Sequence, residues 1–378
     1  AMPQMVALFN GVGGGAAALI ALAEFHRELG GLAGEETVSI VLSALIGSIS
    51  FAGSIVAFAK LQELVSGRPI VFPGQNLVDA LILAGAAGLG AAAIAGVEEQ
   101  WVLWALIALA LAFGVMFVLP IGGADMPVVI ALLNAFTGLA ASATGFVLSN
   151  TVLIVSGMLV GASGTLLTLL MAKAMNRSVV NVVFGAFGQV QAGAGEPSAV
   201  DGTVRATTAD DVAVMLAFAR KVIVVPGYGM AVAQAQHDVR QLAEVLEQKG
   251  VDVAYAIHPV AGRMPGHMNV LLAEANVPYD QLKEMDEINP EFAQTDVALV
   301  IGANDVTNPA ARDDTASPIY GMPILDVDRA ASVVVLKRSM KPGFAGIDNR
   351  LYLDPKTQML FGDAKESVVK LIGAVKAA

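Results

Sequence analysis

Six apolar stretches dominate the first half of the chain, and each is long enough to cross a lipid bilayer, which requires about 20 apolar residues. The short connections between them hold most of the charged residues of this half. The pattern predicts a polytopic α-helical membrane domain over residues 1–176. Its spans are expected at roughly residues 3–23, 37–59, 77–96, 101–121, 127–148 and 151–172.

Basic residues in the connections predict how these spans are oriented. Lys60 and Arg68 follow the second span, and Lys173 and Arg177 follow the sixth. By the positive-inside rule, both connections face the cytoplasm. The second half of the chain is therefore expected on the cytoplasmic side, and Trp101 is expected at the outer interface of the fourth span.

The first and fifth spans share a pattern at a constant spacing. Met2-Pro3 with Asn10 recurs as Met126-Pro127 with Asn134. A buried amide in a bilayer needs a partner, either another helix or water. Each Asn therefore makes an interhelical hydrogen bond or lines a water-filled proton path, and both interpretations stay open.

Ionisable residues are sparse within the spans. Asp79 lies near the start of the third span and Asp125 just before the fifth, and either could serve only as a helix cap. No span carries an ionisable residue at its middle, so a complete proton relay is not expected in this chain alone. Abundant Gly, Ala, Ser and Thr predict closely packed helices.

The second half changes to an alternation of strands and helices, typical of a Rossmann-like doubly wound α/β domain. A Gly-rich polar stretch over residues 185–210 indicates a linker, so we assign residues 177–210 to the linker and 211–378 to the domain. Strands are predicted at residues 222–225, 252–257, 297–301, 323–327 and 333–337, with a closing helix at 364–375.

A glycine motif lies between the first of these strands and a helix predicted to run to Gln248. Gly227 permits a tight turn, and Gly229 lets the backbone approach a pyrophosphate at a helix N-terminus. Val232 stands where a third Gly or Ala is usual. The motif therefore favours a dinucleotide site and leaves a bare tight turn as the alternative.

Charges at the strand ends favour NADP over NAD. NAD-specific domains usually carry an acid at the end of the second strand, but this strand ends in Ala256-Ile257-His258-Pro259. Lys337-Arg338-Ser339 instead ends the last predicted strand, where a Lys and an Arg could bind a phosphate. A solvated basic pair is the alternative. The loops at 258–267, 302–305 and 341–346 have the Gly- and Pro-shaped sequences of segments that close over ligands.

Composition agrees with a membrane protein. Of 378 residues, 56% are hydrophobic and 15% are charged, with a mean hydropathy of +0.67, against about 25% charged in soluble proteins. The absence of Cys excludes disulfides and thiolate metal sites, and the net charge of −11 gives no reason to expect nucleic acid as a partner. The opening Ala-Met-Pro predicts no signal peptide and suggests a fragment, or numbering from inside a longer subunit.

Six motifs together resemble the beta subunit of proton-translocating nicotinamide nucleotide transhydrogenase. They are Gly-Gly-Ala-Asp-Met-Pro (122–127), Lys-Ala-Met-Asn-Arg-Ser (173–178), Pro-Gly-Tyr-Gly-Met-Ala-Val-Ala-Gln-Ala-Gln (226–236), His-Pro-Val-Ala-Gly-Arg (258–263), Gly-Ala-Asn-Asp (302–305) and Lys-Arg-Ser-Met (337–340).

The resemblance implies a membrane domain that conducts protons and a domain that binds NADP(H). A partner alpha subunit, with membrane helices of its own, would present NAD(H), and hydride would pass directly between the two nicotinamides. The family also implies further N-terminal helices, a dimer of the whole complex, contact with membrane lipid, and the bacterial inner membrane as location.

The resemblance also implies roles for individual residues. The pyrophosphate cradle would be Gly227, Tyr228, Gly229, Met230, Ala231 and Val232, and the 2′-phosphate site Lys337, Arg338 and Ser339. Residues near the cofactor and in coupling would be Arg263, Gly302, Asn304 and Asp305. The lid would be Gly343, Phe344 and Ala345, with Phe344 where relatives often have Tyr.

In the membrane domain, the resemblance assigns polar positions of the proton path to Asp125 and Asn134. Asn10 occupies a place where many relatives carry His, so the titrating group is expected from a partner helix.

The competing hypothesis is a channel or transporter gated by a nucleotide-binding domain. No Thr-Val-Gly-Tyr-Gly filter occurs among the spans. A purely structural membrane anchor would leave Lys337, Arg338 and the glycine motif unexplained.

Overall fold

The computed structural model describes residues 2–27, 34–66, 69–97, 99–122, 125–175, 178–179, 182, 203–264, 266–315, 317, 319–341 and 347–378. Two compact units divide the chain, the first built on residues 1–173 and the second on residues 192–378. Most of the predicted linker lies outside the described residues.

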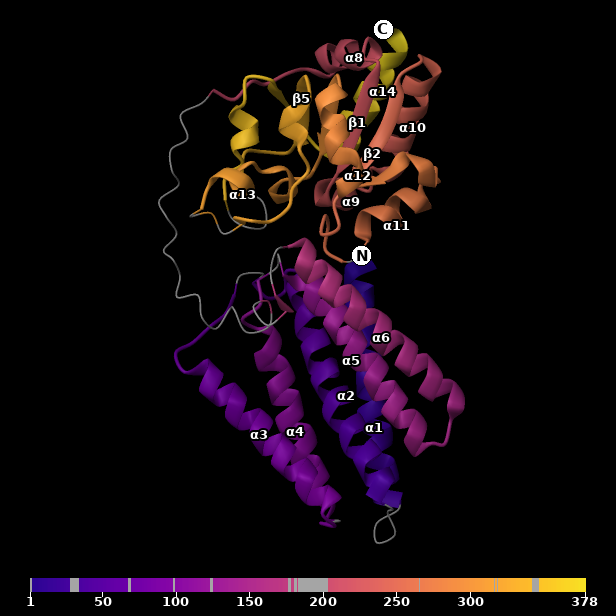
Figure 1. The fold of residues 1–378 in the computed structure, drawn as a ribbon, viewed down its shortest axis with the longest axis vertical. Helices are drawn as coiled ribbons and strands as arrows, with labels where there is room; N and C mark the ends of the chain where they lie inside the picture. The colour runs from indigo at the N-terminus through magenta and orange to yellow at the C-terminus, as the bar shows by residue number, and fades with distance from the viewer. Residues whose placement is uncertain are drawn as a thin grey trace. The chain divides into compact units, whose positions relative to one another are not determined.

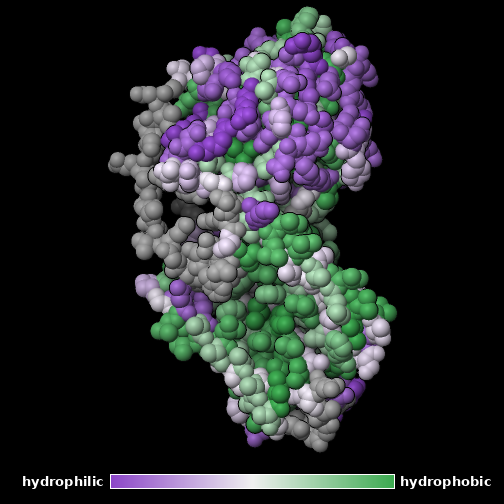
Figure 2. Space-filling model, in the orientation of Figure 1, coloured by the Kyte–Doolittle hydropathy of each residue, from purple (hydrophilic) through white to green (hydrophobic). Residues whose placement is uncertain are grey.

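The first unit contains six long helices, all apolar enough to cross a membrane, as predicted (Figure 1). Figure 2 shows the apolar surface spread over this half. Trp101 and Trp104 point outward on α4, with exposed fractions of 58% and 53%. The helices are α1 (Met2–Arg27), α2 (Gly34–Leu61), α3 (Gln75–Ile94), α4 (Gln100–Val118), α5 (Met126–Val147) and α6 (Thr151–Ala174).

Small residues set the helix spacing, as the sequence predicts. A Cβ added to Gly14 on α1 would lie 2.7 Å from the carbonyl oxygen of Gly47 on α2. A Cβ on Gly138 of α5 would lie 2.6 Å from the backbone nitrogen of Gly161 on α6. Only glycine allows these backbones to approach so closely. Gly14 and Gly138 occupy matching places in the repeat, so each copy uses its glycine for packing.

Lys60 does not lie in a connection. It belongs to the last turn of α2, is 4% exposed, and its Nζ donates to the carbonyl oxygens of Val118, Leu119 and Ile121 at 3.2, 2.5 and 2.8 Å. The last carbonyls of α4 have no partner within their own helix, and Lys60 satisfies them. The prediction that Lys60 lies in the connection after the second span is therefore wrong, because α2 continues to Leu61.

The second unit is built on a six-stranded, fully parallel sheet of order β3-β2-β1-β4-β5-β6. This is the doubly wound order of dinucleotide-binding domains, and it confirms the predicted fold class. The strands are β1 (Lys221–Pro226), β2 (Asp252–Ile257), β3 (Leu282–Glu284), β4 (Val297–Ile301), β5 (Ser332–Lys337) and β6 (Thr357–Phe361).

Alternate residues of β1, β2, β4, β5 and β6 enter two separate cores. Val222 and Val224 of β1 pack with one layer of helices, and Ile223 and Val225 pack on the opposite face. The first layer contains α8 (Ala209–Ala217), α10 (Gln236–Gln248), α11 (His267–Glu274) and α14 (Ala364–Ala377). The second contains α12 (Met285–Ile288) and the 3₁₀ turns η3 (Asn289–Gln294), η5 (Val327–Arg329) and η6 (Arg350–Leu353).

Two sequence predictions within this unit are wrong. The helix expected to run from the glycine motif to Gln248 is broken, because Gln234 takes a left-handed conformation (φ 51°) between α9 (Tyr228–Ala233) and α10. The strand predicted at residues 323–327 is absent from the described chain, because residues 323–326 have no regular secondary structure and Val327 begins η5. Pro323 cannot donate to a ladder, and the Leu325 amide donates instead to the Val306 carbonyl at 2.9 Å.

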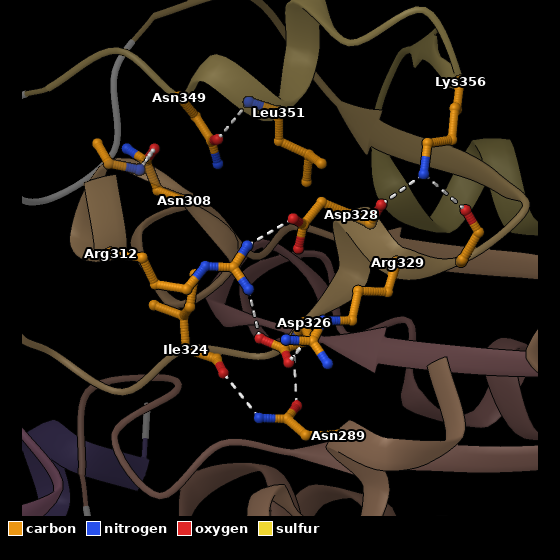
Figure 3. A network of polar contacts seen from close by, with 12 residues as sticks. Asn289, Asn308, Arg312, Ile324, Asp326, Asp328, Arg329, Asn349, Leu351 and Lys356 are labelled. Atoms are coloured by element: carbon orange, nitrogen blue, oxygen red, sulfur yellow. Dashed lines mark hydrogen bonds and ion pairs between the residues drawn. The ribbon is translucent and has the colours of Figure 1, made fainter. Parts of the chain in front are cut away.

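Polar contacts hold this segment in place (Figure 3). Arg312, from α13 (Ala310–Asp313), pairs with Asp326 at 2.7 Å and with Asp328 at 2.5 Å. Asn289 donates to the Ile324 carbonyl and accepts from the Asp326 amide, both at 3.0 Å. These contacts hold residues 324–328 of the β4–β5 connection against α13 and η3.

Candidate functional site at the carboxyl edge of the sheet

The predicted glycines meet at the centre of the sheet, where the strand order reverses between β1 and β4. The Gly227 amide donates to the Ile301 carbonyl at 2.9 Å, and the Gly229 amide donates to the Gly302 carbonyl at 3.0 Å. A Cβ on Gly229 would lie 2.7 Å from the Cα of Gly302, which itself has φ +67°. These glycines therefore join the two loops at the switch point where doubly wound domains bind ligands.

The start of α9 presents the rest of the motif. Tyr228 lies under the Arg263 guanidinium, whose Cζ is 4.0 Å from the ring centroid, so the loop after β2 is held against the loop after β1. Met230 is fully buried, and Val232 is 48% exposed. Val232 therefore faces outward and does not fill a close helix–sheet contact. Ala231 is partly buried and packs against the core.

Lys337 lies at the end of β5 on a buried aromatic ring. Its Nζ is 4.7 Å from the centroid of Tyr352 and donates to the Lys341 carbonyl at 2.7 Å. Partial burial lowers the pKa of the Lys337 ammonium, while the carboxylates of Asp305 and Asp348 oppose that shift. A phosphate would supply the anionic partner that a partly desolvated ammonium favours.

Asn304, after β4, is fixed by two residues that sequence reasoning missed. Its Oδ1 accepts from the Tyr352 hydroxyl at 2.5 Å, and its carbonyl accepts from Asn349 Nδ2 at 2.9 Å. Asn304 Nδ2 is buried and has no hydrogen-bond partner in the described part of the chain. That donor is available to a ligand. Asp305 follows as the first residue of η4 (Asp305–Thr307).

Arg338 already has an anionic neighbour, Asp363 of the β6–α14 loop. Its Nη2 lies 2.7 Å from Asp363 Oδ2, and the Arg338 side chain is 64% exposed. This hydrogen bond is the main cause that lowers the pKa of Asp363. The next residue, Ser339, accepts from the Lys341 amide at 3.4 Å. Asp363 follows β6, a strand that the sequence analysis does not predict, so nothing in the sequence indicated that Asp363 lies at this edge.

The structure thus brings four strand-end loops together at one edge, as predicted: those holding Arg263, Gly227, Gly302 and Lys337. The lid residues Gly343, Phe344 and Ala345 lie outside the described residues.

In the first unit, Asn10 lies where α1 meets α2 and α5. Its carbonyl accepts from Thr137 Oγ1 at 3.0 Å, and Thr137 also shares a hydrogen bond of 2.6 Å with Ser50. Ser54 lies beside this level, with its Cβ 3.4 Å from a Cβ built on Gly11. Asn10 Nδ2 and Ser54 Oγ are buried and without a partner among the described residues.

A second hydroxyl pair continues this arrangement along the same two helices. Ser43 and Thr144 are 2.6 Å apart, seven residues from Ser50 and Thr137 respectively. Along α2, Ser43, Ser50 and Ser54 therefore form one polar face, about 16 Å long at 1.5 Å per residue. All three are fully buried. We call this set, with Thr137, Thr144 and Asn10, the hydroxyl column.

The remaining predicted membrane residues take different places. Asn134 is half-buried on α5, one turn before Thr137. Asp125 is the N-cap residue of α5, and its side chain makes no capping hydrogen bond. Asp79 is not a cap, because α3 begins at Gln75 with Gly74 as its N-cap.

Comparison with known proteins shows which family combines such a membrane unit with such a parallel-sheet unit. The family profile for the NAD(P) transhydrogenase beta subunit matches residues 1–374. Two sequences described as NAD(P) transhydrogenase subunit beta, both from Rhodospirillum rubrum and one of them from a designated strain, are each 50% identical to this chain. Each alignment covers 99% of this chain and 82% of the relative.

The chain belongs to the NAD(P) transhydrogenase beta-subunit family. It is therefore a multi-pass membrane subunit of an enzyme that transfers hydride between nicotinamide nucleotides and couples the transfer to proton translocation. Membership also implies an alpha subunit as its partner. The gated-channel hypothesis is excluded by this membership.

Proposed function

We propose that the second unit of this transhydrogenase subunit binds NADP(H) and that the partner alpha subunit holds NAD(H). The polar positions at the carboxyl edge of the sheet support the proposal. The residues fit a dinucleotide: the orphaned Asn304 Nδ2 and the cations Lys337 and Arg338 surround an edge at which the strand order reverses. When bound, NADP(H) supplies the hydride carrier of the reaction.

The observation that carries the choice of NADP is the placement of charge at the two ends of the site. His258, at the end of β2, is 1% exposed, and its Nε2 faces the Pro323 carbonyl at 2.9 Å. No carboxylate there can receive a ribose 2′-hydroxyl. Lys337, Arg338 and Ser339, at the end of β5, would hold the 2′-phosphate instead.

The other site residues take consistent parts in this proposal. Residues 227–232 would hold the pyrophosphate at the β1 loop, with Gly302 and Asn304 beside it. Arg263 on Tyr228 would shape the opposite wall, and residues 343–345 would cover the nucleotide. Asp305, next to Asn304, would take part in coupling, because its charge acts on both Lys337 and Tyr352.

We further propose that protons cross the first unit beside the hydroxyl column, with Asn10 and Asn134 on the path and Asp125 at its end. A polar group buried in a bilayer needs a partner, and water is the partner still open to Asn10 Nδ2 and Ser54 Oγ. The domain bounds would be residues 1–176, 177–210 and 211–378. The setting would be a bacterial inner membrane with the nucleotide domain in the cytoplasm, lipid around the helices, and two whole complexes forming a dimer.

The test is the loss of one phosphate contact. Arg338→Ala should weaken NADPH binding roughly tenfold or more, because a charge-assisted contact contributes about 1.5–3 kcal/mol. NADH binding should barely change, since NADH lacks the 2′-phosphate. Both nucleotides are titrated into the purified full chain by calorimetry.

Arg220→Ala is the matched control. Arg220 pairs with Asp296 at 3.5 Å beside the opposite, amino edge of the sheet, so its loss should leave both affinities unchanged. Equal losses for NADPH and NADH in Arg338→Ala would overturn the 2′-phosphate assignment.

A further inference from the structure

Asp79 lies on the face of α3 that packs against its own bundle. It is 7% exposed and shares this face with Ala86, Gly90 and Ala93, which are also buried. A Cβ on Gly90 would lie 2.8 Å from Val41 on α2 and 3.4 Å from Leu106 on α4. Asp79 therefore lies in the seam between α3 and its neighbours, while most other residues of α3 face outward.

Two neighbouring residues in this seam carry acceptor oxygens that lack donors. Neither carboxylate oxygen of Asp79 has a hydrogen-bond partner among the described residues, and the same holds for Gln75 Oε1. Gln75 is 3% exposed, and its Nε2 donates to the Met116 carbonyl near the end of α4 at 3.2 Å. Residues four apart on a helix are neighbours, so Gln75 and Asp79 present three open acceptor oxygens side by side.

Among the residues that the structure describes, none supplies a free cation to this seam. No residue of α4 is ionisable. Lys60, at the end of α2, is the charged group facing the end of α4, and its ammonium is occupied by three backbone carbonyls. An ionised Asp79 would therefore be a buried anion without compensation.

One proton on Asp79 would neutralise the buried carboxylate and supply the donor that Gln75 Oε1 lacks. We propose that Asp79 is a proton-binding site of the membrane unit, holding a proton at neutral pH and donating it in a hydrogen bond to Gln75 Oε1. The proton comes from water and binds a carboxylate oxygen, and no other bond breaks. If a side chain of a partner subunit donated to Asp79 instead, that side chain would have to enter the packed seam between α3 and its neighbours. This inference depends on the helices lying in the bilayer, and not on which nucleotide the second unit binds.

Infrared spectroscopy of the assembled complex in lipid vesicles tests the proposal. At pH 7 we expect the carbonyl-stretch band of a protonated carboxyl group, shifted in deuterated water and lost in Asp79→Asn. Asparagine is neutral and can still donate to Gln75, so this variant should assemble. Glu63→Gln, which removes an exposed carboxylate from the connection after α2, should keep the band.

A spectrum of Asp79→Asn identical to that of the unaltered complex would overturn the proposal. So would a band that forms only near pH 4, as for a solvated Asp, or one that forms at pH 7 only when sodium is withheld, which would indicate a cation site. If Asp79→Asn assembles poorly, Asp79→Glu must shift the band, and an unshifted band counts against the site. NADPH titration of the same samples separates these outcomes from a failure of the nucleotide assignment.

Discussion

At the scale of single residues, Tyr352 joins two parts of the candidate site. Its ring lies beneath the Lys337 ammonium, 4.7 Å from Nζ to the centroid, and its hydroxyl donates to Asn304 Oδ1 at 2.5 Å. The side chain is 2% exposed, and burial raises the pKa of its hydroxyl, so it remains a donor. Tyr352 is therefore a positioning residue for both Lys337 and Asn304.

Two substitutions separate these contacts. Tyr352→Phe keeps the ring under Lys337 and should reduce NADPH affinity by less than about threefold, while the lost hydroxyl lowers unfolding stability by about 1 kcal/mol. Tyr352→Leu also removes the cation–π contact, worth about 1 kcal/mol, and should reduce NADPH affinity about fivefold. Calorimetric titration and urea unfolding measure both effects. Unchanged affinity in Tyr352→Leu would show that Lys337 needs no aromatic support.

At the scale of elements, the sequence predicts the helices and strands that consist of a continuous apolar run. All six membrane helices follow from such runs, and β1, β2, β4 and β5 follow from buried apolar segments. The strand β3, Leu282–Glu284, carries two charged residues and gave no such signal. The segment at 323–327 is apolar because Leu325 and Val327 fill one core of the sheet and Ile324 is also buried, which hydrophobicity alone cannot distinguish from a strand.

The candidate site shows the same limit. Gly227, Gly302 and Lys337 could be predicted because each lies at or just after the end of a predicted strand. Asn349 and Tyr352 could not, because they cap and form a 3₁₀ turn and reach Asn304 across 45 and 48 residues of chain. Such contacts depend on tertiary folding and leave no local pattern.

His258, which follows β2, makes a hydrogen bond to the Pro323 carbonyl of the β4–β5 connection. Protonation of His258 should destabilise this arrangement. Its Nδ1 accepts from the Val260 amide at 3.2 Å, so its Nε2 carries the hydrogen that faces the Pro323 carbonyl. Burial lowers the pKa of His258 to about 4, against about 6.5 when unfolded. Stability is therefore complete above about pH 6.5 and falls as the pH drops toward 4, because the unfolded chain binds more protons.

The expected contribution of His258 to this loss is about 2 kcal/mol between pH 7.5 and pH 5. Urea unfolding of the full chain at both values measures it. His258→Gln should have a smaller pH dependence. His237→Gln, at an exposed position on α10, should behave like the unaltered chain. A pH dependence unaffected by His258→Gln would assign the effect to other groups.

At the scale of the whole molecule, the two units have opposite characters. The first is apolar and the second hydrophilic (Figure 2), and the residues proposed for proton movement and for nucleotide binding belong to different units. Moving one charge through 100 mV is worth about 2.3 kcal/mol, which corresponds to a change in affinity of about fortyfold. A proton gradient could therefore drive the reaction by changing how tightly NADP(H) is held, with no hydride chemistry in the membrane.

That coupling makes Asn134 the decisive membrane residue. It lies one turn before Thr137, whose hydroxyl reaches both Ser50 and the Asn10 carbonyl, so an apolar side chain there should interrupt hydration beside the hydroxyl column. Asn134→Leu should abolish proton pumping and slow proton-coupled turnover of the assembled complex, measured by vesicle acidification. NADP(H) binding in the absence of a gradient should persist, because the second unit is unaltered.

Ser156→Ala provides the matched membrane control. Ser156 is exposed on α6, and within the described part of the chain it bonds only to carbonyls of its own helix, those of Val152 and Leu153 at 2.6 and 3.4 Å, so its loss should leave pumping at the normal rate. If Asn134→Leu vesicles acidify as fast as this control, Asn134 has only a packing role. The proton path would then have to run along another face of α5, and the hydroxyl column would be a means of helix association.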